Sequence, residues 1–233
     1  MMRLDKFLCE TGGYSRSEAK ELLKKGNVTL NGQLEKKAEY KINETLDTIK
    51  VNGIAMNYEK NHYYLLHKPA GVITATEDNR HHTVLDLLDG IDTRKLFPVG
   101  RLDKDTEGLL LITDDGELSH RLLSPRKQVE KKYYAILRDV ITSEAVSRLE
   151  HGVDIGDTDI TLPAKVKCLN EREIELIICE GRYHQVKRML QAVNNEVKYL
   201  KRLSMGSLCL PDDLSKGMFR RLTTEEVYKL KQE

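Results

Sequence analysis

An apolar block at residues 109–112 is the feature around which the rest of the chain can be organised. It reads Leu-Leu-Leu-Ile, with a charged segment before it and an Asp-Asp-Gly turn at residues 114–116 after it. A short apolar run bounded by turn residues predicts a strand that is buried on both faces. The charged segment before it is then a loop held by a rigid strand, which is a suitable position for a reactive side chain.

The hydrophobic spacing of residues 3–25 predicts two short helices. The first has apolar residues three and four positions apart and ends at a pair of glycines, and Ser15 with Glu18 forms a capping box for the second. Two Asn-Gly pairs, at residues 31–32 and 52–53, lie between strand-like segments and predict β-hairpins. Two helices followed by a small sheet within 60 residues indicate a compact module.

Beyond residue 61 the pattern alternates between strands and helices without a regular βαβ repeat. The short polar stretch at residues 57–61 predicts a linker, which divides the chain into domains 1–60 and 61–233. The predicted strands of the second domain are at residues 63–66, 109–112, 132–137, 164–168 and 174–179. The predicted helices are at residues 84–88, 117–123, 142–150 and 183–193, with a last helix after a capping box at 223–226. This arrangement favours an α+β fold over a doubly wound sheet.

The composition is typical of a soluble cytoplasmic protein. The four cysteines are far apart and form no Cys-x-x-Cys pair, which argues against a zinc site and a disulfide framework. The charged N-terminus lacks the apolar core of a secretion signal, and no apolar run approaches the roughly 18 residues of a membrane helix. We therefore expect no membrane partner.

The distribution of charge is more informative than the net charge of +1. Residues 119–138 and residues 181–202 each contain six Lys or Arg and a single acid, whereas the remainder of the chain is acidic. Such basic segments are usually solvated faces of a protein. Aromatic residues within them, such as Tyr133 and Tyr183, favour the alternative of a surface that binds nucleic-acid phosphates.

Several kinds of chemistry are compatible with the charged segment, whose candidate residues are Arg101, Asp103, Asp105 and Glu107. Residues 103–114 approximate a calcium loop, with acids at positions one, three, five and twelve and glycine at six, but helices do not flank it. Magnesium binding by a phosphoryl-transfer enzyme is a second interpretation, although neither glycine-rich phosphate loop occurs. A salt-bridged turn is a third, and the residue types alone leave these interpretations open.

The N-terminal module resembles the S4 RNA-binding domain. The resemblance is carried by RLDKFL, SRSEAKELLKKG and NVTLNG, which occur in this order within residues 3–32. It implies two helices that present basic residues to structured RNA, whereas the alternative is an amphipathic helix pair with a solvated face. The implied RNA contacts are Arg3, Lys6, Arg16, Lys20, Lys24 and Lys25.

Four further motifs resemble those of pseudouridine synthases and occur in the expected order. They are Lys-Pro-x-Gly-Val at 68–72, Gly-Arg-Leu-Asp-x-x-Thr-x-Gly-Leu-Leu-Leu at 100–111, Glu-Lys-x-Tyr at 130–133 and Glu-Gly-Arg-Tyr-His-Gln-Val-Lys-Arg-Met at 180–189. Together with the S4-like module, they have the layout of the RsuA/RluB family. The resemblance implies a small S4-like (αL-type) domain followed by a catalytic domain with a large mixed, mainly antiparallel sheet and flanking helices.

This resemblance implies an isomerase that converts a uridine of rRNA into pseudouridine without a cofactor or a metal. The wording of the last motif is similar to that of RsuA-like members, which implies 16S rRNA as the partner and the uridine at position 516 as the target. The alternatives are a 23S rRNA synthase of the same family and a non-catalytic S4-type protein that binds rRNA or assists ribosome assembly. We expect a monomer.

The resemblance also implies a role for each residue of the catalytic site. Asp103 acts on the nucleoside after the base has been flipped out of the RNA, and Lys187 holds its carboxylate, with Arg182 as the second choice. Arg101 occupies the space that the base leaves, and Tyr133 stacks on the base. The implied RNA contacts of this domain are Arg182, His184, Gln185 and Arg188. Asp105 and Glu107 are expected on the polar surface of the loop, without a catalytic role.

Overall fold

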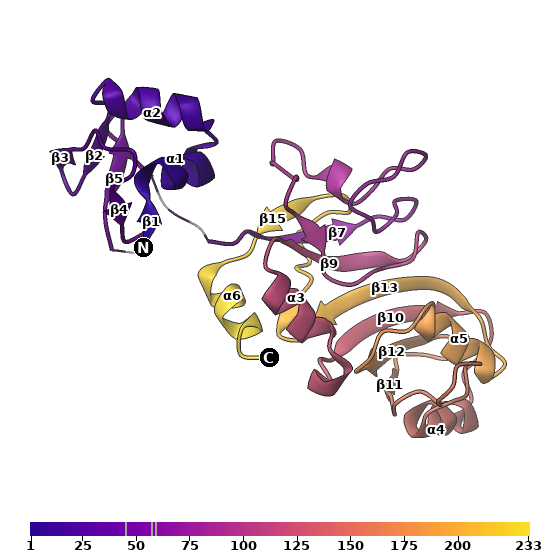
Figure 1. The fold of residues 1–233 in the computed structure, drawn as a ribbon. Coiled ribbons are helices and arrows are strands. Elements are labelled where there is room, and N and C mark those ends of the chain that lie inside the picture. Colours follow the sequence, from indigo (N-terminus) through magenta and orange to yellow (C-terminus); the bar gives the residue numbers. More distant parts are fainter. Residues whose placement is uncertain (45, 57, 59) are drawn as a thin grey trace. The chain divides into compact units, whose positions relative to one another are not determined.

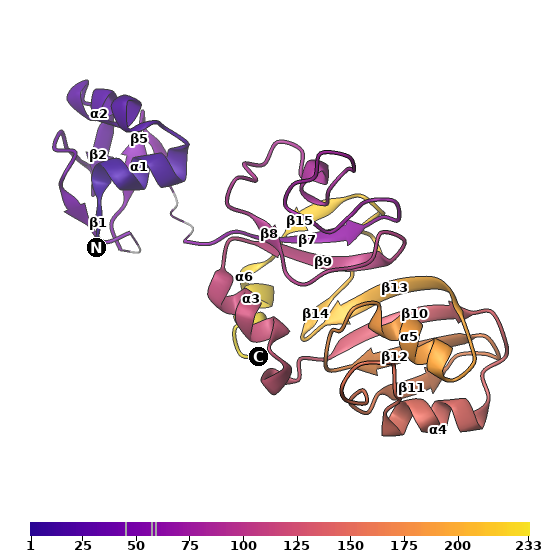
Figure 2. The same ribbon diagram turned by 45° about the vertical axis from the view of Figure 1, so that its right-hand side comes forward.

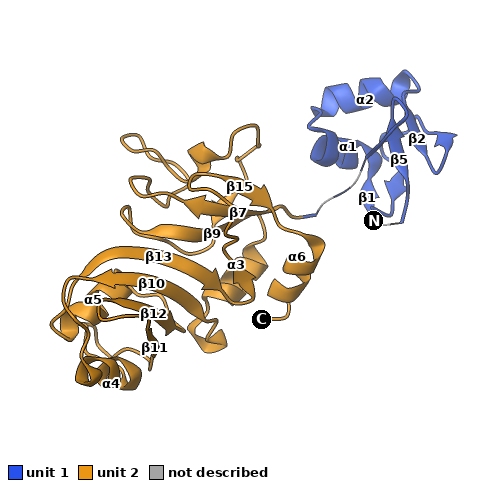
Figure 3. Cartoon of the chain, turned by 180° about the vertical axis from the view of Figure 1, so that it is seen from behind, with its two compact units in different colours: residues 1–60 blue, residues 61–233 orange. Residues whose placement is uncertain are grey.

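The chain folds into two compact units, residues 1–60 and residues 61–233, each with its own hydrophobic core (Figure 3). The computed structural model describes residues 1–44, 46–56, 58 and 60–233. Two positions of the predicted linker, 57 and 59, therefore lie outside the described residues. Among the described residues, no helix is long and apolar enough to cross a membrane.

Unit 1 consists of two helices and short strands around a small apolar core. Its helices are α1 (Leu4–Gly12) and α2 (Arg16–Lys24), and its four-stranded sheet has the order β3 (Gln33–Leu34), β2 (Val28–Leu30), β5 (Ile49–Val51) and β6 (Ile54–Met56). Strands β1 (Met2–Arg3) and β4 (Lys41–Ile42) form a separate pair. The predicted capping box is present, because the Ser15 hydroxyl accepts from the Glu18 amide while the Glu18 carboxylate accepts from the Ser15 amide.

The two predicted hairpins of unit 1 are confirmed. They join β2 to β3 and β5 to β6, and each turn is an Asn-Gly pair with positive φ at both residues. A two-residue turn of this kind matches the twist of the flanking strands, and glycine with asparagine tolerates the left-handed conformation best.

Unit 2 is built on a nine-stranded, mainly antiparallel sheet, as the resemblance implied (Figure 1). Its main path runs through β11 (Lys165–Cys168), β12 (Glu173–Ile178), β10 (Lys131–Leu137), β13 (Val197–Met205), β9 (Glu107–Thr113), β7 (Tyr63–Lys68) and β15 (Phe219–Arg221). The short strands β14 (Leu208–Cys209) and β8 (Phe97–Pro98) pair with β13 and β9. Only the pairing of β9 with β13 is parallel among the strands described.

Helices and loops cover the sheet and bury β9 on both faces. One apolar cluster joins α4 (Ser143–His151), α5 (Gln185–Ala192) and the 3-10 turn Leu85–Leu87 to one face of the sheet (Figure 2). A second cluster lies under α3 (Gly116–Leu123) and α6 (Thr224–Leu230). Because side chains alternate along a strand, Leu110 and Ile112 enter the first cluster while Leu109 and Leu111 enter the second. The predicted strand at 109–112, buried on both faces, is confirmed.

Several elements differ from the sequence prediction, among them the short strands β8, β14 and β15, which were not predicted. The nine-residue strand β13 was not predicted, although it connects the two halves of the sheet. The predicted helix at 183–193 begins only at Gln185, because His184 adopts a left-handed conformation with φ of 48°. The predicted helix at 84–88 is a single 3-10 turn. The predicted helix at 117–123 is confirmed as α3, and the 3-10 helix Pro125–Lys127 follows it.

Candidate active site

A cavity of about 670 Å³ opens beside the loop that precedes β9. The loop contributes Arg101 and Asp103, strand β10 contributes Tyr133, and the first turn of α5 contributes Lys187. These are the four residues proposed from the sequence for catalysis, and the fold brings all of them to one cavity. They come from three separate stretches of the chain, so only the tertiary structure decides their proximity.

The carboxylate of Asp103 lies against two basic side chains of the α5 segment. The ammonium nitrogen of Lys187 is 3.1 Å from Oδ2 of Asp103, and Nε2 of His184 is 3.4 Å from Oδ1. Lys187 also binds Asp105, whose Oδ1 lies 2.6 Å from Nζ. Lys187 is therefore the residue that pairs with Asp103.

The shared lysine stays charged despite its partial burial. Burial lowers the pKa of Lys187, but the hydrogen bonds that Lys187 donates to Asp105 and Asp103 outweigh burial and raise the pKa overall. Burial likewise raises the pKa of Asp105, yet the hydrogen bond and charge of Lys187 lower it on balance. The site thus holds an ionised lysine between two carboxylates.

The loop that carries Asp103 is fixed by a buried lysine of the Lys-Pro motif. The ammonium group of Lys68 is fully buried and donates to the carbonyl oxygens of Pro69 at 3.0 Å and Thr106 at 2.9 Å. Burial lowers the pKa of Lys68 to about 8, although Asp105 and Asp103 oppose that shift. On the other side of Asp103, the hydroxyl of Thr74 donates to the carbonyl of Leu102 at 2.7 Å. The carboxylate is therefore presented by a loop held at both ends.

Tyr133 and Arg101 lie on different parts of the cavity wall. Tyr133 is only 8% exposed and stands on the inner face of β10, whereas Arg101 is exposed at the loop. A buried aromatic ring offers a surface for stacking, and an exposed guanidinium can move into space that a ligand vacates. The cavity thus combines a carboxylate, a cation and an aromatic wall.

The comparisons with known proteins identify the family. The family model for RNA pseudouridylate synthases matches residues 62–192, and that of the S4 domain matches residues 2–46. The chain belongs to the RNA pseudouridylate synthase family. It is an isomerase that converts uridine in RNA to pseudouridine, with an S4 domain at its N-terminus.

Relatives of this synthase match it over almost its full length. The "Uncharacterized RNA pseudouridine synthase YtzG" of Bacillus subtilis (strain 168) is 46% identical over 98% of both chains. The "Ribosomal small subunit pseudouridine synthase A" proteins of Vibrio cholerae and Escherichia coli (strain K12) are 43% and 39% identical, each over 97% of this chain and 98% of theirs. A solved structure described as a pseudouridylate synthase superposes with a TM-score of 0.70 at 36% identity, covering 99% of this chain and all of the other.

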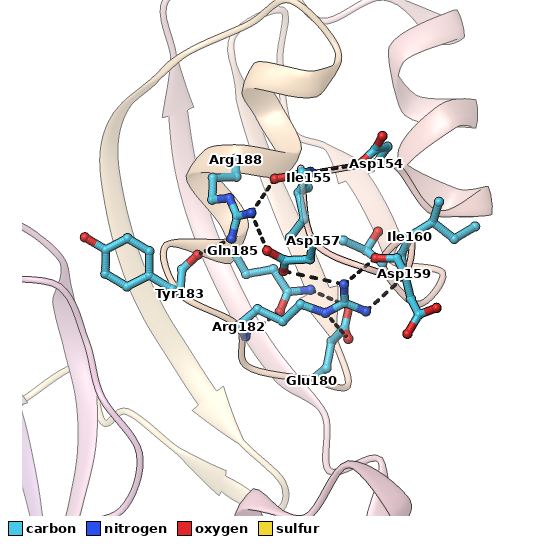
Figure 4. A network of polar contacts seen from close by, with 12 residues as sticks. Asp154, Ile155, Asp157, Asp159, Ile160, Glu180, Arg182, Tyr183, Gln185 and Arg188 are labelled. Atoms are coloured by element: carbon cyan, nitrogen blue, oxygen red, sulfur yellow. Dashed lines mark hydrogen bonds and ion pairs between the residues drawn. The ribbon is translucent and has the colours of Figure 1, made fainter.

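Arg182 does not reach Asp103 in this synthase. Figure 4 shows its guanidinium turned towards the segment after α4, where it donates to the carbonyl oxygens of Asp159 and Ile160 at 2.6 and 2.9 Å. Its Nε donates to the buried carboxylate of Glu180 at 2.9 Å. The second choice for the partner of Asp103 is therefore wrong.

Gln185 and Arg188 belong to the same internal network. Gln185 is 4% exposed and donates to Glu180 at 2.7 Å, while its carbonyl oxygen accepts from the amide of Arg182. Arg188 donates to the carbonyl of Ile155 and to Asp157, the latter at 2.5 Å (Figure 4). The resemblance implied RNA contacts for these side chains. In the structure they fasten the start of α5 to the neighbouring loop, and Arg182 and Gln185 also line the cavity of Asp103. His184 alone of the four implied contacts in this motif approaches Asp103.

The two acids set aside in the sequence analysis occupy different environments. Asp105 has a side chain that is 73% exposed, as expected, although it also shares Lys187. Glu107 is only 8% exposed. Its carboxylate accepts a hydrogen bond from Tyr199 at 2.5 Å and forms an ion pair with Lys216 at 2.7 Å. The prediction that Glu107 lies on the polar surface of the loop is wrong, because Glu107 is the first residue of β9.

The calcium interpretation of residues 103–114 does not fit the structure. Seven residues of this segment form the extended strand β9, which separates Asp103 from Asp114 by roughly 20 Å at about 3.3 Å per residue. Asp114 instead pairs with His62 at 2.8 Å. No cluster of three or more metal-ligating side chains occurs among the described residues.

The basic side chains assigned to RNA in the S4 domain are all exposed. Arg3 is held by Asp5 through two hydrogen bonds of 2.8 and 3.0 Å, and Lys25 forms an ion pair with Glu21 at 2.7 Å. The exposed pair of Lys25 with Glu21 is weak and leaves that lysine available to phosphate, whereas Asp5 is largely buried and holds Arg3 more firmly.

Two members of the basic segments do not lie on the surface. Lys131 of β10 is 6% exposed and Arg202 of β13 is 2% exposed, and both line the cavity of Asp103. Sequence reasoning counted them as part of a phosphate-binding surface. The only local signal for their burial was the alternation of β10, which places Lys131 on the same face as Tyr133.

Proposed function

We propose that this synthase isomerises a uridine of small-subunit rRNA, with 16S rRNA as the substrate and the uridine at position 516 as the target. The single observation that supports catalysis at this cavity is the ion pair between Asp103 and Lys187 in a cavity that Tyr133 also lines. The choice of RNA is supported by the relatives named ribosomal small subunit pseudouridine synthase A, which match nearly the whole chain.

In the proposed reaction, Asp103 acts on the ribose of a uridine that has been flipped out of the RNA. The N1–C1′ bond breaks, the base rotates, and a bond forms between C5 and C1′. The proton on C5 then leaves and N1 acquires a proton, so the product is an isomer of the substrate. Lys187 orients the carboxylate, because an ion pair of 3.1 Å between Nζ and Oδ2 of Asp103 fixes the direction in which the carboxylate points.

The remaining residues of the cavity have roles before and after bond cleavage. Flipping costs a few kcal/mol, which stacking of the base on Tyr133 and filling of the vacated space by Arg101 would offset. Tyr133 also offers a hydroxyl group for the proton that leaves C5.

Pseudouridine mapping of rRNA tests the proposed substrate. Cells that lack the gene should lose one pseudouridine of 16S rRNA, and expression of the intact protein should restore it. Loss of a 23S site would instead establish the second candidate, a large-subunit synthase. An unchanged pattern in both rRNAs would contradict the proposal.

The substitution Asp103→Asn tests the proposed catalytic residue. It should abolish tritium release from RNA labelled at C5 of uridine, because an amide can neither attack the sugar nor accept its proton, while RNA binding stays within a few fold. Asp105→Asn is the matched control, since it removes an exposed carboxylate from the same lysine. That loss is worth at most about 1 kcal/mol, or roughly fivefold in rate. Tritium release by the Asp103 variant would refute this assignment.

A further inference from the structure

Two buried cations share the inner face of the sheet with Tyr133. Lys131 and Tyr133 are alternate residues of β10, and Tyr133 is directly opposite Arg202 in the pairing of β10 with β13. Side chains at such positions point to the same face of a sheet. Both cations line the cavity that contains Asp103, and each is more than nine-tenths buried.

The protein does not neutralise these two cations. Lys131 donates to the carbonyl of Val129 at 2.8 Å, and Nε of Arg202 donates to the carbonyl of Leu109 at 2.8 Å. The buried Nη2 atom of Arg202 has no hydrogen-bond partner. Within the described residues, no ion pair or hydrogen bond joins either side chain to a carboxylate. Burial lowers the pKa of Lys131, and the nearby charge of Arg202 lowers it further.

A structural role explains only part of this arrangement. Strands β9 and β13 pair at two positions and then separate, and Nε of Arg202 satisfies a carbonyl of β9 close to that point. The hydrogen bond of Nε does not involve Nη2 of Arg202, and it does not explain why a second cation, Lys131, is buried on the same face. Buried charges without partners are costly, and they persist where a ligand supplies the missing charge or hydrogen bond.

We infer that Lys131 and Arg202 bind the carbonyl edge of the flipped uracil and stabilise the negative charge that the base acquires during isomerisation. This inference rests on the proposed function. When the N1–C1′ bond breaks, its electron pair remains with uracil, and the charge spreads over N1 and the two carbonyl oxygens. The same electron density then forms the C5–C1′ bond, after which C5 loses its proton and N1 gains one. Fixed cations that face the departing base lower the energy of this charged state.

A phosphate of the RNA backbone carries the same kind of charge but fits the site less well. A backbone phosphate is joined to a ribose on each side, so it needs an open groove for the chain to enter and leave. Arg202 and Lys131 are only 2% and 6% exposed, in a cavity that Tyr133 also lines. Such side chains are accessible to a group that projects from the RNA chain, such as a flipped base. The site therefore favours the base over a phosphate.

Single-turnover kinetics of Lys131→Met tests the inference. The variant has nearly the same volume without the charge, and its rate of tritium release should fall about 100-fold, which is typical of losing one stabilising donor. Its RNA dissociation constant should stay within about threefold, with an unchanged salt dependence, because no phosphate contact is lost. Arg202→Gln should show the same pattern. Lys167→Met, which removes an exposed lysine of β11 away from the cavity, is the matched control and should retain the wild-type rate.

A substrate with 5-fluorouridine at the target separates charge stabilisation from a structural role. Fluorine at C5 makes the uracil anion more stable, so cleavage of the N1–C1′ bond should depend less on the protein cations. The ratio of wild-type to Lys131→Met cleavage rates, followed by nuclease digestion and mass spectrometry, should therefore be smaller for this RNA. Equal ratios for both substrates would mean that Lys131 acts only through structure.

Other outcomes overturn the inference in distinguishable ways. Weaker RNA binding with a reduced salt dependence would assign the cations to a phosphate, and a wild-type rate in Lys131→Met would remove them from catalysis. Inactivity of the wild-type enzyme on all rRNA fragments would instead overturn the proposed function itself. Wild-type activity that is lost in Asp103→Asn but kept in Lys131→Met would overturn this inference alone.

Discussion

At the scale of single residues, this synthase uses a few cations for tasks that their sequence neighbourhoods do not reveal. Lys187 lies between Asp103 and Asp105, Lys68 fixes the loop before β9, and Arg182 fastens the segment before α5. All three side chains are cationic, yet only Lys187 faces Asp103, the proposed catalytic residue. The difference arises from burial and from which acceptors surround each side chain.

A carboxylate in the last helix, α6, permits a test of how the stability of the fold depends on pH. Glu226 accepts two hydrogen bonds from Arg220 and completes the capping box of α6, and these contacts hold its pKa at about 2. Because the pKa is lowered, its contribution to stability is complete above about pH 4.5 and is lost as the pH falls from there towards 2.

Replacement of this carboxylate should therefore have a pH-dependent effect. Glu226→Gln should lower the free energy of unfolding by on the order of 2 kcal/mol at pH 7 and by much less at pH 2.5. Urea unfolding at the two pH values measures the difference. Glu225→Gln is the control, since its side chain is 74% exposed and its ion pair with Lys229 contributes little. An equal loss at both pH values would exclude the ionised state as the cause.

At the scale of elements, the junction between β9 and β13 determines the architecture of the site. The strands pair only through Glu107 with Lys201 and Gly108 with Arg202. Gly108 has φ of 108°, and a Cβ atom there would lie 2.2 Å from the carbonyl oxygen of Arg202. A side chain at this position would push the two strands apart, and with them the loop of Asp103 and the cation of β13.

The close contact at the junction predicts a large effect of one methyl group. Gly108→Ala should lower the free energy of unfolding by about 3 kcal/mol or more, because it combines backbone strain with a clash against main-chain atoms. Gly116→Ala provides the control: no atom lies within 4 Å of its added Cβ, and alanine favours the helix that begins there. Denaturant unfolding measures both variants. A Gly108 variant as stable as the wild type would show that the strands can separate without cost.

At the scale of the whole molecule, the proposed function assigns RNA binding to the S4 domain and chemistry to the catalytic domain. Each unit has its own core, so loss of surface charge in one should leave the other folded. The three S4 cations on α2, Arg16, Lys20 and Lys24, are exposed and near one another in sequence. Neutralising them should affect association with the RNA backbone without changing the reaction of bound RNA.

This division predicts a separation of binding from catalysis in the intact chain. Replacement of Arg16, Lys20 and Lys24 by Gln should weaken RNA binding and reduce the slope of log K against log salt by about two to three, at roughly 0.9 per phosphate contact. The rate at saturating RNA should stay unchanged. Replacement of three exposed lysines elsewhere in the unit, Lys36, Lys37 and Lys50, serves as the control. Equal effects of both triple variants would mean that α2 has no special role.

The sequence by itself determined the features that depend on residues close together in the chain. The capping boxes at Ser15 and Thr223, the Asn-Gly hairpins and the buried strand at 109–112 all form where they were predicted. In each case the decisive interaction spans a few residues, so spacing and residue type are sufficient. The order of motifs was likewise sufficient to indicate the family.

Only the tertiary structure decided which charges meet. It placed Lys187 on Asp103, turned Arg182 towards the carbonyl oxygens of Asp159 and Ile160, buried Glu107 in β9, and brought Lys131 and Arg202 to the same cavity. The loop of Asp103 meets the cations of β10 and β13 because β9 pairs in parallel with β13, and local patterns did not reveal strand β13. Side chains of one type differ in burial and partners according to long-range packing, and a one-dimensional pattern of charge contains no information about that packing.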